Sequence, residues 1–205
     1  LSSCGGGGYS FDFVNSLYEP VTPAVASSPH ASALAGCTFN ASRNTSCSLN
    51  ELPFIGLDSS RVTVDSVMNH VVASQPWMSE RFRQLLETLP PDVLQMMKPV
   101  TAIVITGKVR PSYYRALTGA IYLDPQNLWT TQEELNSINR TPDYRNAYAS
   151  KLKISTLWRY AKDNAYAYKY YPLDSTETRT IDDIKLPFFA LIVHEMAHAG
   201  DYAPP

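Results

Sequence analysis

The feature that most constrains the fold of this chain is a segment close to its end, residues 187–199. Every side chain in this segment is apolar or small except His194, Glu195 and His198. An apolar run of this length with so few polar positions predicts a helix that is buried on most of its sides. The chain must therefore build a core around this helix. A content of 44% hydrophobic and 18% charged residues allows it to do so.

The three polar residues of this helix form the pattern His-Glu-x-x-His. Residues four apart lie on the same face of a helix, so His194 and His198 can bind one zinc ion. Glu195 lies about 100° round the helix from His194, where it can act on a water molecule as general base and then protonate the leaving amine. The alternative is a pair of core histidines flanking a chance glutamate, but three polar groups in an apolar helix are costly without a metal or partners. The pattern predicts a single zinc site.

This motif resembles that of the zincin metallopeptidases. Residues 194–202 are most similar to the glutamate-zincin type, which includes the lethal-factor-like group, whereas Asp201 and Pro204 depart from the metzincin pattern. The resemblance implies an α+β, zincin-like domain in which a small mixed sheet presents an antiparallel edge strand over the active-site helix. It also implies a third zinc ligand, a Glu downstream of Pro205, so the chain is expected to be C-terminally truncated or a degenerate member.

Further site residues are expected near the motif. Asp201 lies on the same face of the helix as the two histidines. It is expected either to orient one of the zinc ligands or to be a weak third ligand. Tyr202 is either a transition-state stabiliser or a packing residue at the end of the helix. The other two histidines, His30 and His70, are expected to be bystanders. The substrate-binding edge strand is predicted at 119–123, that is, at Gly119, Ala120, Ile121, Tyr122 and Leu123.

Residues flanking that strand are candidate substrate contacts, namely Arg110, Tyr113, Tyr114 and Arg115. Ten of the chain's 13 tyrosines lie between Tyr113 and Tyr171. The functional interpretation is a groove that stacks on peptide or glycan, and the preferred alternative is half-exposed strands, which favour Tyr.

The first residues, Leu-Ser-Ser-Cys, resemble the lipobox of a bacterial lipoprotein. The resemblance implies that Cys4 is the lipidated first residue of the mature protein and that the glycines at 5–8 form a flexible leash. The alternative is a clipped N-terminus with a stray cysteine. In bacterial lipoproteins an Asp directly after the lipidated Cys retains the protein at the inner membrane. The residue at this position is Gly5, so the expected location is the outer membrane, facing the periplasm or the surface.

Residues 1–50 carry only three charged side chains and show no helical or strand periodicity. They are predicted to form a lipid-anchored tether, and residues 51–205 the N-terminal part of the catalytic domain. Cys37 and Cys47 are the pair that remains if Cys4 is lipidated. In an oxidising, exported compartment they are expected to form a disulfide, because a metal site would need more ligands than this loop offers.

Sequence patterns also predict the main elements of residues 51–205. Helices are expected at 63–73 behind Thr63, at 80–89 behind Ser79, at 91–97, and from Thr131 to about 139. Strands are expected at 100–109 and 119–123, with one or two tyrosine-rich strands within 151–171. Pro187 fits the first turn of the last helix and Gly200 its C-terminal cap.

Charge and composition argue against two classes of function. The net charge is −2 and no basic stripe is present, which argues against a nucleic-acid partner. The longest apolar run, 186–193, is too short to span a bilayer, so the expected membrane contact is the lipid anchor alone. The predicted function is a zinc-dependent metallopeptidase of the bacterial cell envelope, acting on a peptide or protein substrate. The alternatives are a non-catalytic envelope lipoprotein and a zinc hydrolase of another substrate.

Overall fold

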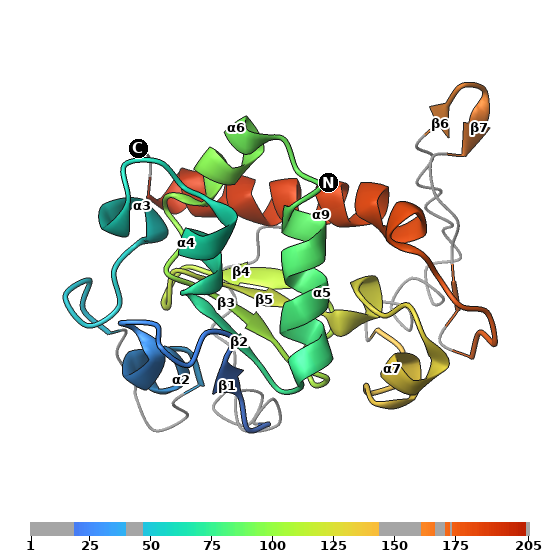
Figure 1. Ribbon diagram of the computed structural model, residues 1–205, viewed down its shortest axis with the longest axis horizontal. Helices are drawn as coiled ribbons and strands as arrows, with labels where there is room; N and C mark the ends of the chain where they lie inside the picture. Colours follow the sequence, from blue (N-terminus) through green and yellow to red (C-terminus); the bar gives the residue numbers. More distant parts are fainter. Residues whose placement is uncertain (1–18, 40–46, 144–160, 167–170, 173, 204–205) are drawn as a thin grey trace, which may run out of the picture.

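A five-stranded mixed sheet lies at the centre of the fold (Figure 1). The computed structural model describes residues 19–39, 47–143, 161–166, 171–172 and 174–203. In these residues the strand order is β1-β2-β3-β5-β4. The central strands β2, β3 and β5 are parallel, and β1 and β4 pair antiparallel at the two edges. This small mixed sheet agrees with the predicted α+β class. The strands are β1 (Thr22–Pro23), β2 (Val71–Ala73), β3 (Ala102–Ile105), β4 (Tyr113–Arg115) and β5 (Ala120–Leu123).

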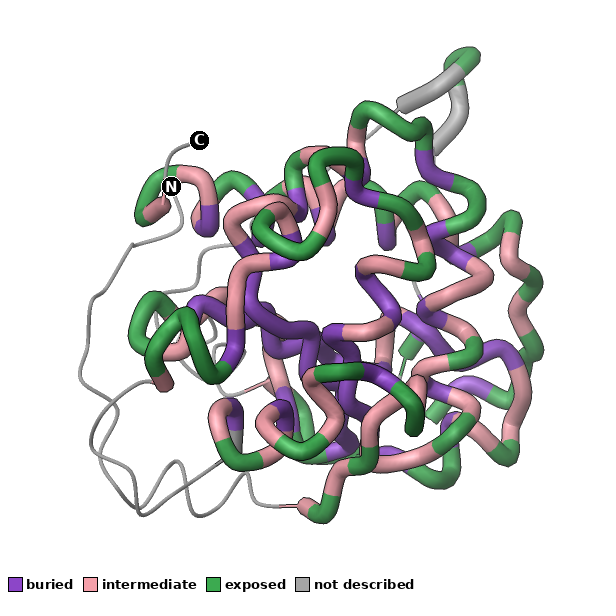
Figure 2. The backbone as a smooth tube through the Cα atoms, turned by 60° about the vertical axis from the view of Figure 1, so that its left-hand side comes forward, coloured by how far each residue is buried: buried purple, intermediate pink, exposed green. Residues whose placement is uncertain are grey.

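Both faces of the sheet are covered. Successive side chains of a strand point to opposite faces, and in β3 Ile103 and Ile105 join one hydrophobic cluster while Ala102 and Val104 join another. All four are fully buried. A strand buried on both faces is apolar throughout, which explains the uninterrupted apolar run of β3. The strands form the buried centre of the tube in Figure 2.

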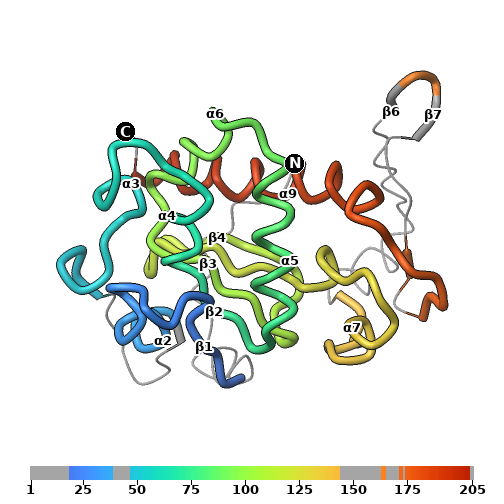
Figure 3. Tube along the Cα trace, viewed as in Figure 1, coloured from blue at the N-terminus to red at the C-terminus, as the bar shows by residue number. Residues whose placement is uncertain are grey.

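Helices α4, α5 and α9 pack on the first face, that of Ile103 and Ile105. They span Val64–Met68, Pro76–Leu86 and Ile181–Tyr202. Helix α9 contacts α5 through an edge-to-face pair of Phe188 and Phe82, whose ring centroids are 5.9 Å apart. Figure 3 shows α9 as one continuous helix on the side of the sheet opposite α2. None of the helices in the described ranges is long and apolar enough to cross a membrane.

The second face is covered by a segment that was expected to be tether. Helix α2 (Ala31–Phe39) places the fully buried Leu34 against Val72 and Val104, and strand β1 pairs with β2. Tyr122 donates a hydrogen bond to the carbonyl of Thr38 at 2.6 Å. The tether prediction is therefore wrong for residues 19–39. The error arose because a short helix of mostly small residues needs few large apolar side chains, so it leaves little periodicity in the sequence.

Replacing Leu34 by Ala tests whether α2 belongs to the core. We expect Leu34→Ala to lower the free energy of unfolding by about 2–4 kcal/mol, because it removes a fully buried side chain and leaves a cavity. The matched control is Leu57→Ala, at a side chain that is 66% exposed, where a change within about 0.5 kcal/mol is expected. Urea denaturation measures both. Equal, small losses in the two variants would show that α2 does not stabilise the domain.

Two predicted helices have different bounds. The predicted helix 63–73 is only α4, followed by strand β2, because its β-branched end pairs with β3. The predicted helix 80–89 is α5, which begins at Pro76, so Ser79 lies inside the helix and does not cap it. A proline in the first turn sets the start of this helix.

The last helix is longer than predicted. Helix α9 starts at Ile181 behind a capping box of Thr180 and Asp183, so Pro187 lies inside it. It ends at Tyr202, and Gly200 is a helical residue, so the predicted cap at this glycine is wrong. The capping box satisfies the backbone N–H groups of Thr180 and Asp183, and this determines where the helix begins.

Several smaller predictions are confirmed. The predicted helix 91–97 is α6 (Pro91–Leu94) continued by the 3₁₀ helix η1 (Gln95–Met97), and Thr131 caps α7 (Gln132–Asn136) in a capping box. Most of 151–171 lies outside the described residues, but the short strands β6 and β7 within it pair antiparallel. The remaining elements are α3 (Ile55–Asp58), η2 (Pro125–Asn127), β6 (Ala161–Lys162) and β7 (Ala165–Tyr166).

Candidate functional site

The His-Glu-x-x-His motif lies in the last three turns of α9, and the helix presents its two histidines together. His194 is exposed, His198 is half-buried, and their Nε2 atoms are 3.2 Å apart. Two ligands of one tetrahedral zinc ion lie about 3.3 Å apart when each is about 2.0–2.1 Å from the metal. The two imidazole nitrogens therefore already have the separation that a shared zinc ion requires.

The glutamate of the motif differs from His194 in its burial. Glu195 is 4% exposed, and its neighbour Met196 belongs to the core cluster. A carboxylate in such a place needs partners to offset its desolvation. Glu195 is thus buried, whereas His194 one residue before it is exposed and His198 is half-buried.

The surroundings of His194 favour the neutral form of its ring. Burial lowers the pKa of His194, and the neighbouring His198 lowers it further. A depressed pKa keeps the imidazole neutral near pH 7, which is the form that binds a metal. The ring planes of the two histidines are nearly perpendicular, with centroids 4.7 Å apart.

The structure does not bring a third ligand to this pair within the described residues. Asp201 is exposed and does not join His194 and His198 in a group of three ligand atoms. Tyr202 is 65% exposed and its ring lies 5.9 Å from that of Tyr114 on β4. Tyr202 thus lies beside the neighbouring strand β4.

The edge strand is a different one from that predicted. Strand β5, which contains Ala120, Ile121 and Tyr122, pairs with β3 on one side and with β4 on the other, and all three residues are buried. Residues 119–123 therefore cannot accept a further strand, and the prediction that they form the edge strand is wrong. In the described sheet β1 and β4 are the two antiparallel edges, and β4 is the one that contacts α9. The more apolar of β4 and β5 took the interior position, because both of its faces are buried.

Of the flanking residues, Tyr113, Tyr114 and Arg115 form β4 itself and are half-buried. Arg110 has another role. Its guanidinium donates two hydrogen bonds to Asp124, at 2.9 and 3.1 Å, and two to the carbonyls of Asn139 and Thr141. Four of its five donors are engaged, so Arg110 holds the loop after β5 and is not placed as a substrate contact.

A second cluster of ionisable groups was missed by sequence analysis. His30 Nε2 lies 2.5 Å and His70 Nε2 lies 2.7 Å from the same oxygen, Oδ2 of Asp58. One ligand atom from each residue lies within 4.8 Å of the others, so the group can hold a metal ion. Both histidines are predicted from sequence to be bystanders, and the fold brings them to one carboxylate. Asp58 lies 28 residues from His30 and 12 from His70, so only the fold brings them together.

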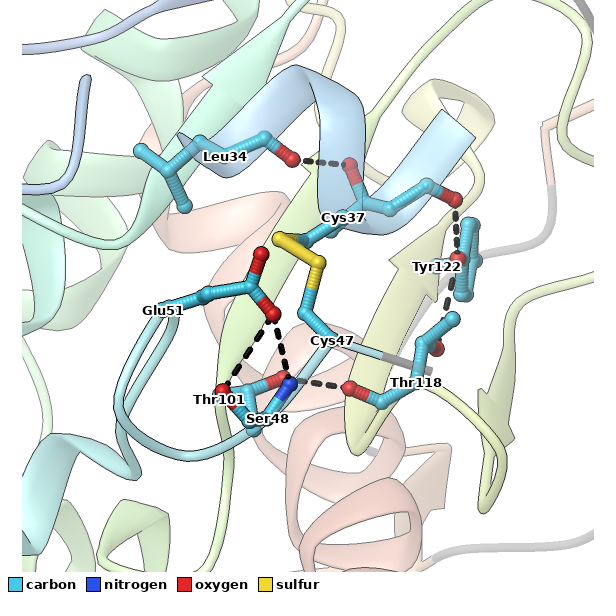
Figure 4. Close-up of a disulfide and its surroundings, with 9 residues drawn as sticks. Leu34, Cys37, Cys47, Ser48, Glu51, Thr101, Thr118 and Tyr122 are labelled. Carbon is cyan, nitrogen blue, oxygen red and sulfur yellow. Dashed lines mark hydrogen bonds between the residues drawn. A yellow bond between two sulfur atoms is a disulfide. The ribbon is translucent and has the colours of Figure 1, made fainter. Parts of the chain in front are cut away.

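Cys37 and Cys47 form the predicted disulfide, with Cα atoms 5.4 Å apart (Figure 4). It joins the end of α2 to the segment that follows it. Near it, Glu51 accepts hydrogen bonds from the backbone N–H and the hydroxyl of Ser48. Cys4, the predicted lipidation site, lies outside the described residues.

Removing the disulfide should destabilise the domain. In the chain-entropy account a bridge across 10 residues contributes about 3 kcal/mol. We expect the double variant Cys37→Ser/Cys47→Ser to lose about that much free energy of unfolding in urea denaturation. Wild type treated with reductant should lose as much, and both thiols should resist alkylation before reduction. A double variant as stable as wild type would contradict this account of α2.

No protein-family model matches the chain, and comparisons with curated proteins and with solved structures also find no match.

Proposed function

We propose that this protein is a zinc-dependent metallopeptidase with a zincin-like domain. The observation that carries the proposal is the Nε2 separation of 3.2 Å between His194 and His198, next to a Glu195 that is 4% exposed. His194 and His198 would hold the ion, and we propose a carboxylate from outside the described residues as the third ligand. Zinc in this position would lower the pKa of a water molecule towards neutrality and polarise a scissile carbonyl.

Glu195 is the proposed general base. Its carboxylate would take a proton from the attacking water and give it to the leaving amine, so that the proton is conserved across the reaction. The rigid helix fixes this carboxylate one residue from the first ligand. Burial strengthens its electrostatic interaction with the reacting groups, because little water screens it.

The proposed substrate is an extended peptide. Strand β4 has an unpaired backbone edge in the described sheet, runs antiparallel to β5 and contacts α9. A peptide that adds to such an edge forms main-chain hydrogen bonds along the strand, and its side chains alternate towards and away from the helix. This arrangement supports the zincin-like assignment and replaces the strand predicted from sequence.

We further propose that the protein acts in the bacterial cell envelope, lipid-anchored through Cys4. The Cys37–Cys47 disulfide supports an oxidising compartment. A second candidate is a non-catalytic envelope lipoprotein, which is favoured by the lack of a third ligand at the histidine pair within the described residues.

Metal removal separates the two candidates. We expect the purified native protein to cleave members of a peptide library and to lose this activity after dialysis against a chelator. Stoichiometric zinc should restore it, because the ion supplies the Lewis acid. Magnesium added in the same way is the control and should restore nothing, because it prefers oxygen ligands. A protein that binds zinc at the pair and cleaves no peptide would favour the non-catalytic lipoprotein.

A further inference from the structure

We propose that His30, Asp58 and His70 form a second metal site, which binds a divalent transition-metal ion such as zinc. The site is independent of the proposed peptidase chemistry. It joins three segments: the start of α2, the end of α3 and the loop between α4 and β2.

The ligand set is the first argument. Two imidazoles and one carboxylate are ligands that zinc and related ions prefer, whereas magnesium and calcium prefer oxygen alone. All three ligand atoms converge, since both Nε2 atoms contact the same Oδ2 of Asp58. The histidine rings lie 4.4 Å apart between centroids. A tetrahedral ion requires ligand atoms about 3.3 Å apart, so small side-chain movements of less than about 1 Å would admit it.

The hydrogen bonding of His70 is the second argument. Its Nδ1 lies 2.7 Å from the carbonyl oxygen of Thr101, and because a carbonyl only accepts, Nδ1 carries the hydrogen. In the neutral ring the lone pair of Nε2 then points at the oxygen of Asp58, and two acceptors face each other. A cation between the two acceptors satisfies both.

The surrounding contacts match those of a metal ligand. A ligating histidine typically donates its other ring N–H to a carbonyl or carboxylate, which fixes the orientation of the ring. His70 does this with Thr101. The hydroxyl of Ser28 accepts from the backbone N–H of His30 and donates to the carbonyl of Asn69, so it holds His30 beside His70. Asp58 is 32% exposed at its side chain, which leaves the site open to an ion and to water as a fourth ligand.

The position of the site indicates what the ion would do. It would link α2, the helix that covers the second face of the sheet, to α3 and to the start of β2 at the centre of the fold. Metal ions that bind the folded state and not the unfolded chain stabilise the fold. We therefore infer that the ion fixes the N-terminal segment to the sheet, alongside the Cys37–Cys47 disulfide.

The test uses zinc as the probe and a background in which the α9 pair is removed, His194→Ala/His198→Ala. This full-length double variant should bind one zinc per chain in equilibrium dialysis with elemental analysis. Adding Asp58→Asn or His30→Ala should weaken that binding by more than about 100-fold, since even the loss of a partner outside the ligand shell costs roughly 10–100-fold. Adding Asp92→Asn, at an exposed acid on α6, is the matched control and should change nothing.

Thermal unfolding gives a second readout that does not depend on activity. Zinc should raise the Tm of the background variant and leave that of its Asp58→Asn derivative unchanged. A background variant that binds no zinc would overturn the proposal, as would Asp58→Asn and His30→Ala derivatives that bind as tightly as the background. Wild type that holds no more zinc than the background would instead contradict the α9 site and leave this one standing.

Discussion

Glu195→Gln should retain its zinc and lose about 10²–10⁴-fold in the rate of peptide cleavage. The amide has nearly the shape of the carboxylate, so it fits the same buried place on α9, but it cannot accept the proton of the attacking water. Metal binding should persist because His194 and His198 remain. Zinc content by elemental analysis and initial rates on one cleaved peptide measure the two effects in the same preparation.

The matched control is Glu80→Gln, at an exposed glutamate on helix α5, which should cleave at the wild-type rate. Either histidine replaced by Ala should lose the zinc ion of the α9 pair together with the activity, which separates ligand from base. A Glu195→Gln protein that cleaves as fast as wild type would contradict the general-base assignment.

Phe188→Ala should lower the free energy of unfolding by about 3–5 kcal/mol, the largest effect on stability that we expect from a single substitution. Phe188 is 0% exposed and packs edge-to-face on Phe82 of α5, so truncation leaves a cavity between the two helices. The next residue, Phe189, is 37% exposed and is the matched control. Phe189→Ala should change the stability by less than about 0.5 kcal/mol.

This pair of variants tests the rotation of α9 about its axis, which determines where the motif points. The helix directs Phe188 into the core and leaves His194 exposed. Urea denaturation of both variants measures the difference. If Phe189→Ala were the more destabilising of the two, the helix would be rotated and the histidine pair would not face outward.

The parts of the fold that depend on interactions between residues close in sequence could be predicted. The His-Glu-x-x-His spacing predicts the histidine pair because residues four apart share one helix face, and the Thr131 capping box marks the start of α7. The two cysteines are a small set in one region of the chain, so their pairing could be predicted as well.

The larger errors share one physical cause, which is that tertiary contacts decide them. Whether β5 or β4 is at the edge depends on the strand order, and the sequence of a single segment does not determine that order. Helix α2 was assigned to the tether because its small residues show no periodicity, yet Leu34 completes the core of the second sheet face. The group of His30, Asp58 and His70 has no motif spacing, and it exists only because α2, α3 and β2 meet.

The central claim is that His194 and His198 bind one zinc ion. Anomalous diffraction at the zinc edge, from crystals of the protein grown with zinc, tests it most directly. We predict an anomalous peak about 2.0–2.1 Å from both Nε2 atoms. A map in which zinc occupies other positions and none lies between the two histidines would contradict the claim.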